Sequence, residues 1–201
     1  ACAPFRRLHV CDRNLEQIKT ENITTHNLLV DVCMAAQFEG ASISGRYRQY
    51  QNKYDDSGST MCTMLARSFA DIGDIVRGKD LYLGNDKEND KLERKLKKIF
   101  KEIHSGLTTT RGNKGQKSAK EYYQDKNGGN FFKLREDWWT LNRKKVWYAI
   151  TCDAGKNDKY FRHTCSNDTT ETDKKCRCAT NDVPTYFDYV PQYLRWFEEW
   201  A

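Results

Sequence analysis

The chain has 201 residues, 38% of them hydrophobic and 31% charged, with a formal net charge of +6. This length fits one domain or two closely packed subdomains, and 25 Trp, Tyr and Phe residues argue against disorder. No stretch approaches the roughly 18 apolar residues of a membrane span, and Ala1–Val10 carries two arginines and no apolar core of a signal peptide.

The first third of the chain predicts two helices. Thr25 is expected to cap a helix whose apolar residues recur every three or four positions, and Gly40 is expected to end it. A second helix is expected to start after Thr60 and to end at Gly78. Cys33 and Cys62 lie on or beside the apolar faces of these helices, so a disulfide between them is one candidate staple.

Three further helices are expected, at Asp86–His104, at Phe131–Ile150 and from Pro191 onwards. Residues 105–117 lack apolar periodicity and contain three glycines, which is typical of an exposed loop. Residues 153–182 are polar and hold three cysteines, which predicts a disulfide-tethered loop. The fold class is therefore expected to be all-α, a disulfide-stapled helical bundle with long polar loops.

Four tryptophans lie among periodic apolar residues and are expected to be core residues rather than exposed binding positions. They are Trp138, Trp147, Trp196 and Trp200.

Eight cysteines in a polar, basic chain favour an oxidised, extracellular framework, so all eight are expected to form disulfides. The pairing stays open. Cys176 and Cys178 are separated by one residue, so each is expected to reach a distant partner. The others are Cys2, Cys11, Cys33, Cys62, Cys152 and Cys165.

The same region has an alternative interpretation as a zinc site. His163, Cys165, Cys176 and Cys178 could supply four ligands to an intracellular, zinc-stabilised, basic nucleic-acid-binding module. Paired zinc ligands are usually separated by two or more residues, whereas these pairs are separated by one. The spacing therefore favours disulfides, and no metal is expected.

The positive charge is concentrated between Lys87 and Lys120, which contain eleven basic and four acidic residues, whereas the rest of the chain has 23 basic and 24 acidic residues. Five of these cations recur on one face of the expected helix, opposite Leu92 and Ile99. Three more lie in the following loop. The predicted polyanion-binding residues are Lys91, Arg94, Lys95, Lys98, Lys101, Arg111, Lys114 and Lys117.

A charged helix face is often only a solvated surface, which is the simpler alternative. A docking surface for a polyanion would bind more weakly as salt rises. Nucleic-acid sites usually add aromatic residues for base stacking, but Phe100 is the one aromatic residue between Lys87 and Lys120. The composition thus favours a sulfated or sialylated polyanion over nucleic acid.

Catalysis is not indicated, because no histidine lies in a known catalytic motif and no glycine-rich phosphate loop occurs. Disulfide-bonded sulfurs could not act as nucleophiles. We expect no enzymatic activity and no cofactor. Two glycosylation sequons, at Asn22 and Asn167, agree with an extracellular chain.

Four long stretches resemble one family. They are ACAPFRRLHVCDRNLE (1–16), ARSFADIGDIVRGKDLYLG (66–84), LREDWWTLNRKKVWYAITC (134–152) and DVPTYFDYVPQYLRWFEEWA (182–201). In this order they are similar to the alpha class of Duffy-binding-like domains of the Plasmodium falciparum erythrocyte membrane protein family, a set of variant surface antigens. The intervening segments 105–130 and 153–182 are where that family varies.

The resemblance implies a helical, disulfide-bonded adhesion module without enzymatic activity, displayed outside the infected erythrocyte as part of a larger membrane-anchored protein. It implies partners such as host-erythrocyte heparan sulfate, heparin, blood-group sugars, complement receptor one and host antibodies, with roles in rosetting and cytoadherence. The chain would hold the end of the first subdomain (about 1–60) and the second (about 61–201), without the third. It does not assign binding residues, so the basic residues above rest on charge alone.

A third hypothesis is that the chain itself binds no receptor. Its ligand site would then lie in the missing subdomain, and this part would serve as an antibody target.

Overall fold

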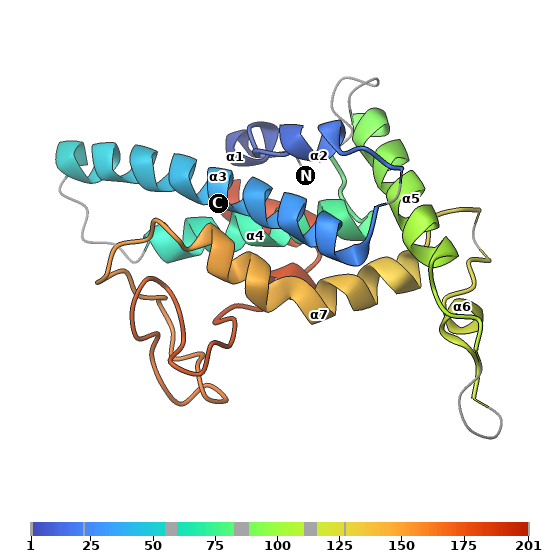
Figure 1. Cartoon of the computed structure of the whole chain (residues 1–201). Coiled ribbons are helices and arrows are strands. Elements are labelled where there is room, and N and C mark those ends of the chain that lie inside the picture. Colours follow the sequence, from blue (N-terminus) through green and yellow to red (C-terminus); the bar gives the residue numbers. More distant parts are fainter. Residues whose placement is uncertain are drawn as a thin grey trace.

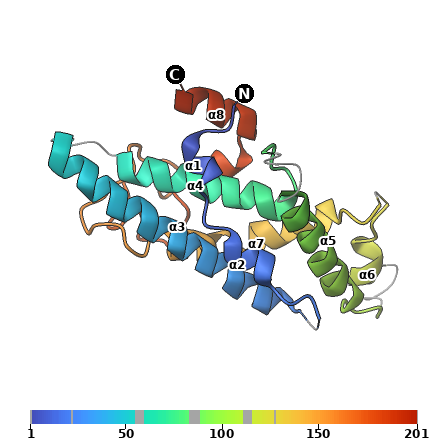
Figure 2. The same ribbon diagram turned by 90° about the horizontal axis from the view of Figure 1, so that it is seen from above.

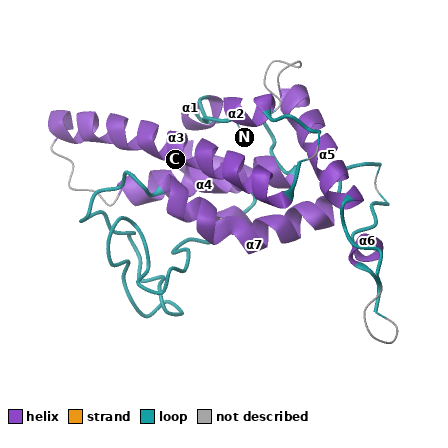
Figure 3. Ribbon diagram, viewed as in Figure 1, coloured by secondary structure: helices purple, strands orange, loops and turns teal. Residues whose placement is uncertain are grey.

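The computed structural model describes residues 2–21, 23–54, 60–82, 89–110, 116–126 and 128–200. In these ranges the chain is helical, without a β-strand, which confirms the all-α prediction (Figures 1 and 3). No described helix is long and apolar enough to cross a membrane. The helices are α1 (Phe5–Leu8), α2 (Arg13–Gln17), α3 (Thr25–Tyr54), α4 (Thr60–Arg77), α5 (Asn89–Ser105), α6 (Ala119–Tyr122), α7 (Phe132–Ile150), the 3-10 helix η1 (Phe187–Tyr189) and α8 (Gln192–Trp200).

The core lies between the three long helices α3, α4 and α7, which run side by side (Figure 1). Phe69 of α4 joins two tryptophans of α7: its ring centroid lies 5.1 Å from that of Trp139 and 5.2 Å from that of Trp147. All three rings are buried. Buried aromatic pairs contribute contact energy beyond their burial, so this cluster fixes α7 on α4.

The predicted helices agree with the structure except at some ends. Gly78 ends α4 as expected, with a φ of +72° that favours glycine. The hydroxyl of Thr24, one residue before the expected cap, accepts a hydrogen bond of 3.3 Å from the backbone N–H of Asn27. The expected start of the third helix, residues 86–88, lies outside the described residues. The final helix follows Pro191 as predicted.

Gly40 does not end a helix, and that prediction is wrong. It lies in the middle of α3, where a Cβ atom would come within 2.0 Å of the carbonyl oxygen of Ile150 in α7. The glycine is needed because the two helix backbones approach closely here.

We expect Gly40→Ala to lower the free energy of unfolding by about 2–3 kcal/mol, because the methyl group forces α3 and α7 apart. Urea unfolding followed by circular dichroism measures this. Gly45 lies in the same helix, and a methyl group added there would meet nothing within 4 Å, so Gly45→Ala is the matched control. It should be neutral or stabilising, by up to about 1 kcal/mol. Equal effects of the two substitutions would contradict the close-packing explanation.

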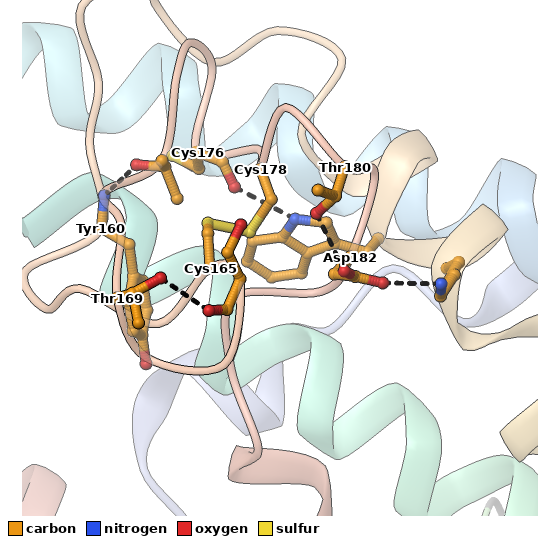
Figure 4. The surroundings of a disulfide bond; sticks show 11 residues. Tyr160, Cys165, Thr169, Cys176, Cys178, Thr180 and Asp182 are labelled. Carbon is orange, nitrogen blue, oxygen red and sulfur yellow. Dashed lines mark hydrogen bonds and ion pairs between the residues drawn. A yellow bond between two sulfur atoms is a disulfide. The ribbon is translucent and has the colours of Figure 1, made fainter.

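Two disulfides hold the segment after α7. Cys62 of α4 pairs with Cys176 across 114 residues, and Cys165 pairs with Cys178 across 13. Figure 4 shows the second bridge beside Cys176. The tethered loop at 153–182 and the distant partners of Cys176 and Cys178 are thus confirmed.

Two cysteine predictions are wrong. Cys62 does not pair with Cys33, because its sulfur is bonded to Cys176. The expectation that all eight cysteines form disulfides also fails, since Cys2, Cys11, Cys33 and Cys152 carry free thiols in this structure.

The tryptophan prediction is confirmed at Trp138, Trp147 and Trp196, which are buried, and is wrong at Trp200, which is 54% exposed. Trp200 lies near the chain's end, where its ring meets Phe5 of α1 and its indole N–H donates to the carbonyl oxygen of Cys2 at 3.0 Å.

A buried ion network ties α1 and α8 to α4, with both chain ends on the same side (Figure 2). The carboxylate of Asp71 is fully buried and lies 2.7 Å from Arg6 and 2.7 Å from Arg195. Arg195 also reaches Asp74 at 2.6 Å, and Arg6 reaches Glu199 at 2.8 Å. Each charge in the network is therefore compensated by at least one opposite charge.

Candidate functional site

The basic face of α5 is present in the structure. Leu92, Leu96, Ile99 and Ile103 are buried against the bundle, so the opposite side of the helix faces solvent. We call the five cations on that side the α5 strip. Four of them are exposed and Lys95 is partly exposed; the strip consists of Lys91, Arg94, Lys95, Lys98 and Lys101.

One acidic residue of α5 is paired with a buried arginine, so its negative charge does not offset the positive charge of the α5 strip. Both carboxylate oxygens of Glu93 accept hydrogen bonds of 2.8 Å from Arg135, whose side chain is fully buried. Arg135 also donates to the carbonyl oxygens of Ile75 and Val76 in α4. This bidentate pair anchors α5 to α4 and α7 and leaves the outer face of the helix predominantly positive.

A second acidic neighbour of the strip lies on α2, and a third lies at the end of α5. Lys91 lies 3.9 Å from Glu16 of α2, and this pair is largely exposed, so it contributes little. Glu102 is exposed at the far end of the helix.

Of the three predicted binding residues in the loop after α5, the structure describes one. Lys117 is exposed, whereas Arg111 and Lys114 lie outside the described residues. The arm that carries Lys117 and α6 is fastened to the end of α5. The backbone N–H of Lys120 donates to the carbonyl oxygen of Thr108, and the His104 ring contacts the carbonyl oxygen of Lys120 at 3.2 Å. The structure thus groups the five helical cations on one face, with Lys117 on the adjoining arm.

A cleft of about 230 Å³ lies along the inner edge of α5, and the sequence patterns did not indicate it. Lys97 extends the positive charge into this cleft, and Phe132 of α7 and Tyr82 form aromatic walls. The cleft depends on how α5 packs against α7, which helical periodicity cannot reveal. The two adjacent phenylalanines at 131–132, at the start of α7, were the available signal.

The zinc alternative is contradicted by the disulfides, because three of its four proposed ligands, Cys165, Cys176 and Cys178, are bonded to other sulfurs. The fourth, His163, contacts the carboxylate of Glu171 at 3.1 Å. Among the described residues, no group of His, Cys, Asp or Glu has the arrangement of a metal site.

The partly buried free thiols are poor nucleophiles. Burial, together with the nearby carboxylate of Glu39, raises the pKa of Cys11 to about 11. Burial also raises the pKa of Cys33 above its usual value. Both thiols are therefore protonated near neutral pH, where the reactive species would be the thiolate.

Comparison with known proteins assigns the chain to a family. The family model of the Duffy binding domain matches residues 1–195. The chain belongs to this family. Comparison with curated protein sequences finds no significant match.

Solved Duffy-binding-like structures resemble the whole chain. The NTS-DBL1(alpha-1) domain of Plasmodium falciparum membrane protein 1 (PfEMP1) from the varO strain is 43% identical, with a TM-score of 0.80. An ICAM-1-binding DBLbeta domain of PfEMP1, IT4var13, is 32% identical with a TM-score of 0.71 over 98% of the chain. The P. falciparum erythrocyte binding antigen 140 shares the fold, at 22% identity and a TM-score of 0.59.

The Duffy-binding-like chain spans less than half of these relatives. It is covered completely by the DBL1-alpha structure but accounts for 43% of that protein's length, and for 42% of the DBLbeta structure. Duffy-binding-like domains of PfEMP1 include receptor-binding modules, as the complex of one DBLbeta domain with human ICAM-1 shows.

Proposed function

We propose that this Duffy-binding-like chain is a host-cell adhesion module that binds a sulfated, heparan-sulfate-like polyanion of the erythrocyte surface through the α5 strip and the adjoining arm. The observation that carries the proposal is the exposed cationic face of α5, where one of the helix's acidic residues, Glu93, is held by the buried Arg135. A linear chain of sulfates can follow a row of cations along a helix, and release of its counterions favours binding.

The ligand class follows from what the strip contains and lacks. It presents cations without interleaved exposed aromatic residues, which disfavours single-stranded nucleic acid. Membership of a family with receptor-binding members supports a role in adhesion rather than catalysis. The same likeness to PfEMP1 domains supports display outside the infected erythrocyte, within a larger membrane-anchored protein accessible to host antibodies. Blood-group sugars and complement receptor one remain alternative receptors within this proposal.

Reversing four charges of the α5 strip tests whether the polyanion-binding site lies there. We expect Lys91→Glu, Arg94→Glu, Lys95→Glu and Lys98→Glu together to weaken binding to immobilised heparin by about 100-fold. Each exposed ion pair contributes up to about 1 kcal/mol, and four attractions become repulsions. Surface plasmon resonance measures the affinity, with circular dichroism to verify the fold. Binding by the unmodified chain should weaken steeply as salt rises.

A control variant with the same change in net charge distinguishes binding at a local site from attraction by the overall charge of the chain. Arg13→Glu, Lys19→Glu, Lys156→Glu and Lys174→Glu change four exposed residues elsewhere by the same total charge. This control should keep most of the heparin affinity. If both quadruple variants lost affinity equally, attraction would come from overall charge and the strip would not be the site.

A further inference from the structure

A groove of about 330 Å³ lies where η1 and the start of α8 meet the end of α4 and the segment that follows it. We call it the tyrosine groove. Four large hydrophobic side chains line it and are nevertheless exposed to solvent: Leu81, Tyr189, Val190 and Tyr193. Apolar side chains that gather in one groove, rather than lying singly on the surface, are typical of a binding site.

The two tyrosines provide aromatic surface and hydroxyl groups. Tyr189 of η1 is 48% exposed and Tyr193 of α8 is 51% exposed. The ring of Tyr189 is restrained by two arginines, because the guanidinium carbon of Arg143 lies 5.1 Å from the ring centroid and that of Arg77 lies 5.9 Å away. Among the described residues, neither tyrosine hydroxyl has a hydrogen-bond partner. Both hydroxyls can therefore donate a hydrogen bond to a ligand.

The backbone around the groove is already hydrogen-bonded within the chain. The backbone N–H of Leu81 donates to the side-chain oxygen of Gln192 at 2.6 Å. Arginine side chains donate to the carbonyl oxygens of Asp188 and Val190. Pro191, which also lines the groove, has no backbone N–H. A partner that binds by adding a β-strand therefore lacks a row of free backbone groups along this described wall.

The charged side chains beside the groove are compensated within the chain. The pairs are Lys79 with Glu136, Arg77 with Asp74, and Arg143 with Asp188, at 2.5, 2.8 and 2.7 Å between the charged atoms. The groove thus offers little net charge, unlike the α5 strip, and an uncharged ligand complements it best.

We propose that the tyrosine groove binds an extended, proline-rich segment of another extracellular protein. Proline rings pack flat against tyrosine rings, and a polyproline II helix leaves its carbonyl oxygens without internal partners, so the two tyrosine hydroxyls can donate to them. Such a segment is stiff before it binds, which lowers the entropic cost of binding. The partner is placed outside the cell because of the proposed display of this domain, whereas the site itself does not depend on polyanion binding at α5.

Titration of the ¹⁵N-labelled chain by NMR tests the proposal. The probe is a peptide of eight prolines with blocked ends, and the matched control is a blocked peptide of the same length that alternates glycine and serine. Both peptides are uncharged, but only the first forms a polyproline II helix. We expect the proline peptide to shift the amide signals of residues 79–81, 188–190 and 192–194, and to bind at least about tenfold more tightly than the control.

Variants locate the binding groups. Tyr193→Ala removes an exposed ring and should weaken binding of the proline peptide about tenfold, whereas Tyr193→Phe removes the hydroxyl alone and should weaken it about threefold. Tyr148→Ala is the matched control, because Tyr148 of α7 is also an exposed tyrosine but lies outside the groove. It should leave binding unchanged, as should Lys98→Glu in the α5 strip.

Four results would overturn the proposal: no binding of the proline peptide, equal binding of the glycine–serine peptide, shifted amides elsewhere in the chain, or unchanged binding by Tyr193→Ala. Shifts of the same amides when the protein alone is concentrated would identify a second copy of the chain as the occupant, and would also overturn it. Heparin binding by Tyr193→Ala should equal that of the unmodified chain, which keeps failure of this site distinct from failure of the α5 site.

Discussion

Replacing Cys62 and Cys176 together by alanine is expected to lower the free energy of unfolding by about 4–5 kcal/mol. The bridge joins α4 to the segment after α7 across 114 residues, so its loss frees a long loop in the unfolded chain. Both cysteines are also buried, and their sulfurs pack in the core. Chemical unfolding of the purified variant, compared with the unmodified chain without reductant, measures the difference.

The second disulfide provides a graded comparison. Removing Cys165 and Cys178, which are 13 residues apart, should cost about 3 kcal/mol, because a shorter loop is released. Cys152→Ala changes an exposed free thiol and should have little effect. A larger loss for the short bridge than for the long one would contradict the view that Cys62–Cys176 is the main cross-link.

Asp71→Asn is expected to destabilise the chain by about 3–5 kcal/mol. The substitution removes the negative charge that lies between Arg6 and Arg195, whose side chains are themselves largely buried, so part of their positive charge loses its partner. α1 and α8 both attach to α4 through this carboxylate, so their packing should loosen together. Thermal unfolding and hydrogen exchange at α1 and α8 measure the loss. Asp168→Asn, at an exposed position in the loop after α7, is the matched control and should change stability little.

The pH dependence of the Asp71 variant provides an independent check. Burial alone would raise the pKa of Asp71, but Arg6 and Arg195 outweigh it and hold the pKa below its usual value. The stabilisation by this carboxylate is therefore complete above its unfolded pKa of about 3.9, and is lost as pH falls through the lower folded pKa. The difference between the unmodified chain and Asp71→Asn should shrink on acidification below about pH 4. A difference that stayed constant would contradict the ion-pair explanation.

Helices and their exposed faces were predictable because they follow a local repeat. The apolar residues of α5 recur every three or four positions, so the opposite row of cations from Lys91 to Lys101 could be inferred before any tertiary contact was known. Gly78 and Gly40 show the limit of such inference. Gly78 ends a helix through its own backbone conformation. Gly40 instead allows close contact with the backbone of Ile150, which lies 110 residues away in the chain.

The features that sequence patterns missed depend on long-range packing. Neither the pairing of Cys62 with Cys176 nor the neutralisation of Glu93 by Arg135 has a local signature. Arg177 has a weak signature in the sequence, because an arginine between two cysteines is fixed if each cysteine forms its own disulfide. The proposed subdomain boundary near residue 60 falls between α3 and α4, which contribute to one shared core.

Adhesion through the α5 strip is the central proposal, and binding to uninfected erythrocytes tests it most directly. The folded chain, the strip variant with four reversed charges and its charge-matched control would be compared by flow cytometry, with and without soluble heparin. We predict heparin-sensitive binding by the unmodified chain and the control, and loss of binding by the strip variant. Binding by the strip variant equal to that of the unmodified chain, or no binding by the folded chain at all, would contradict the proposal.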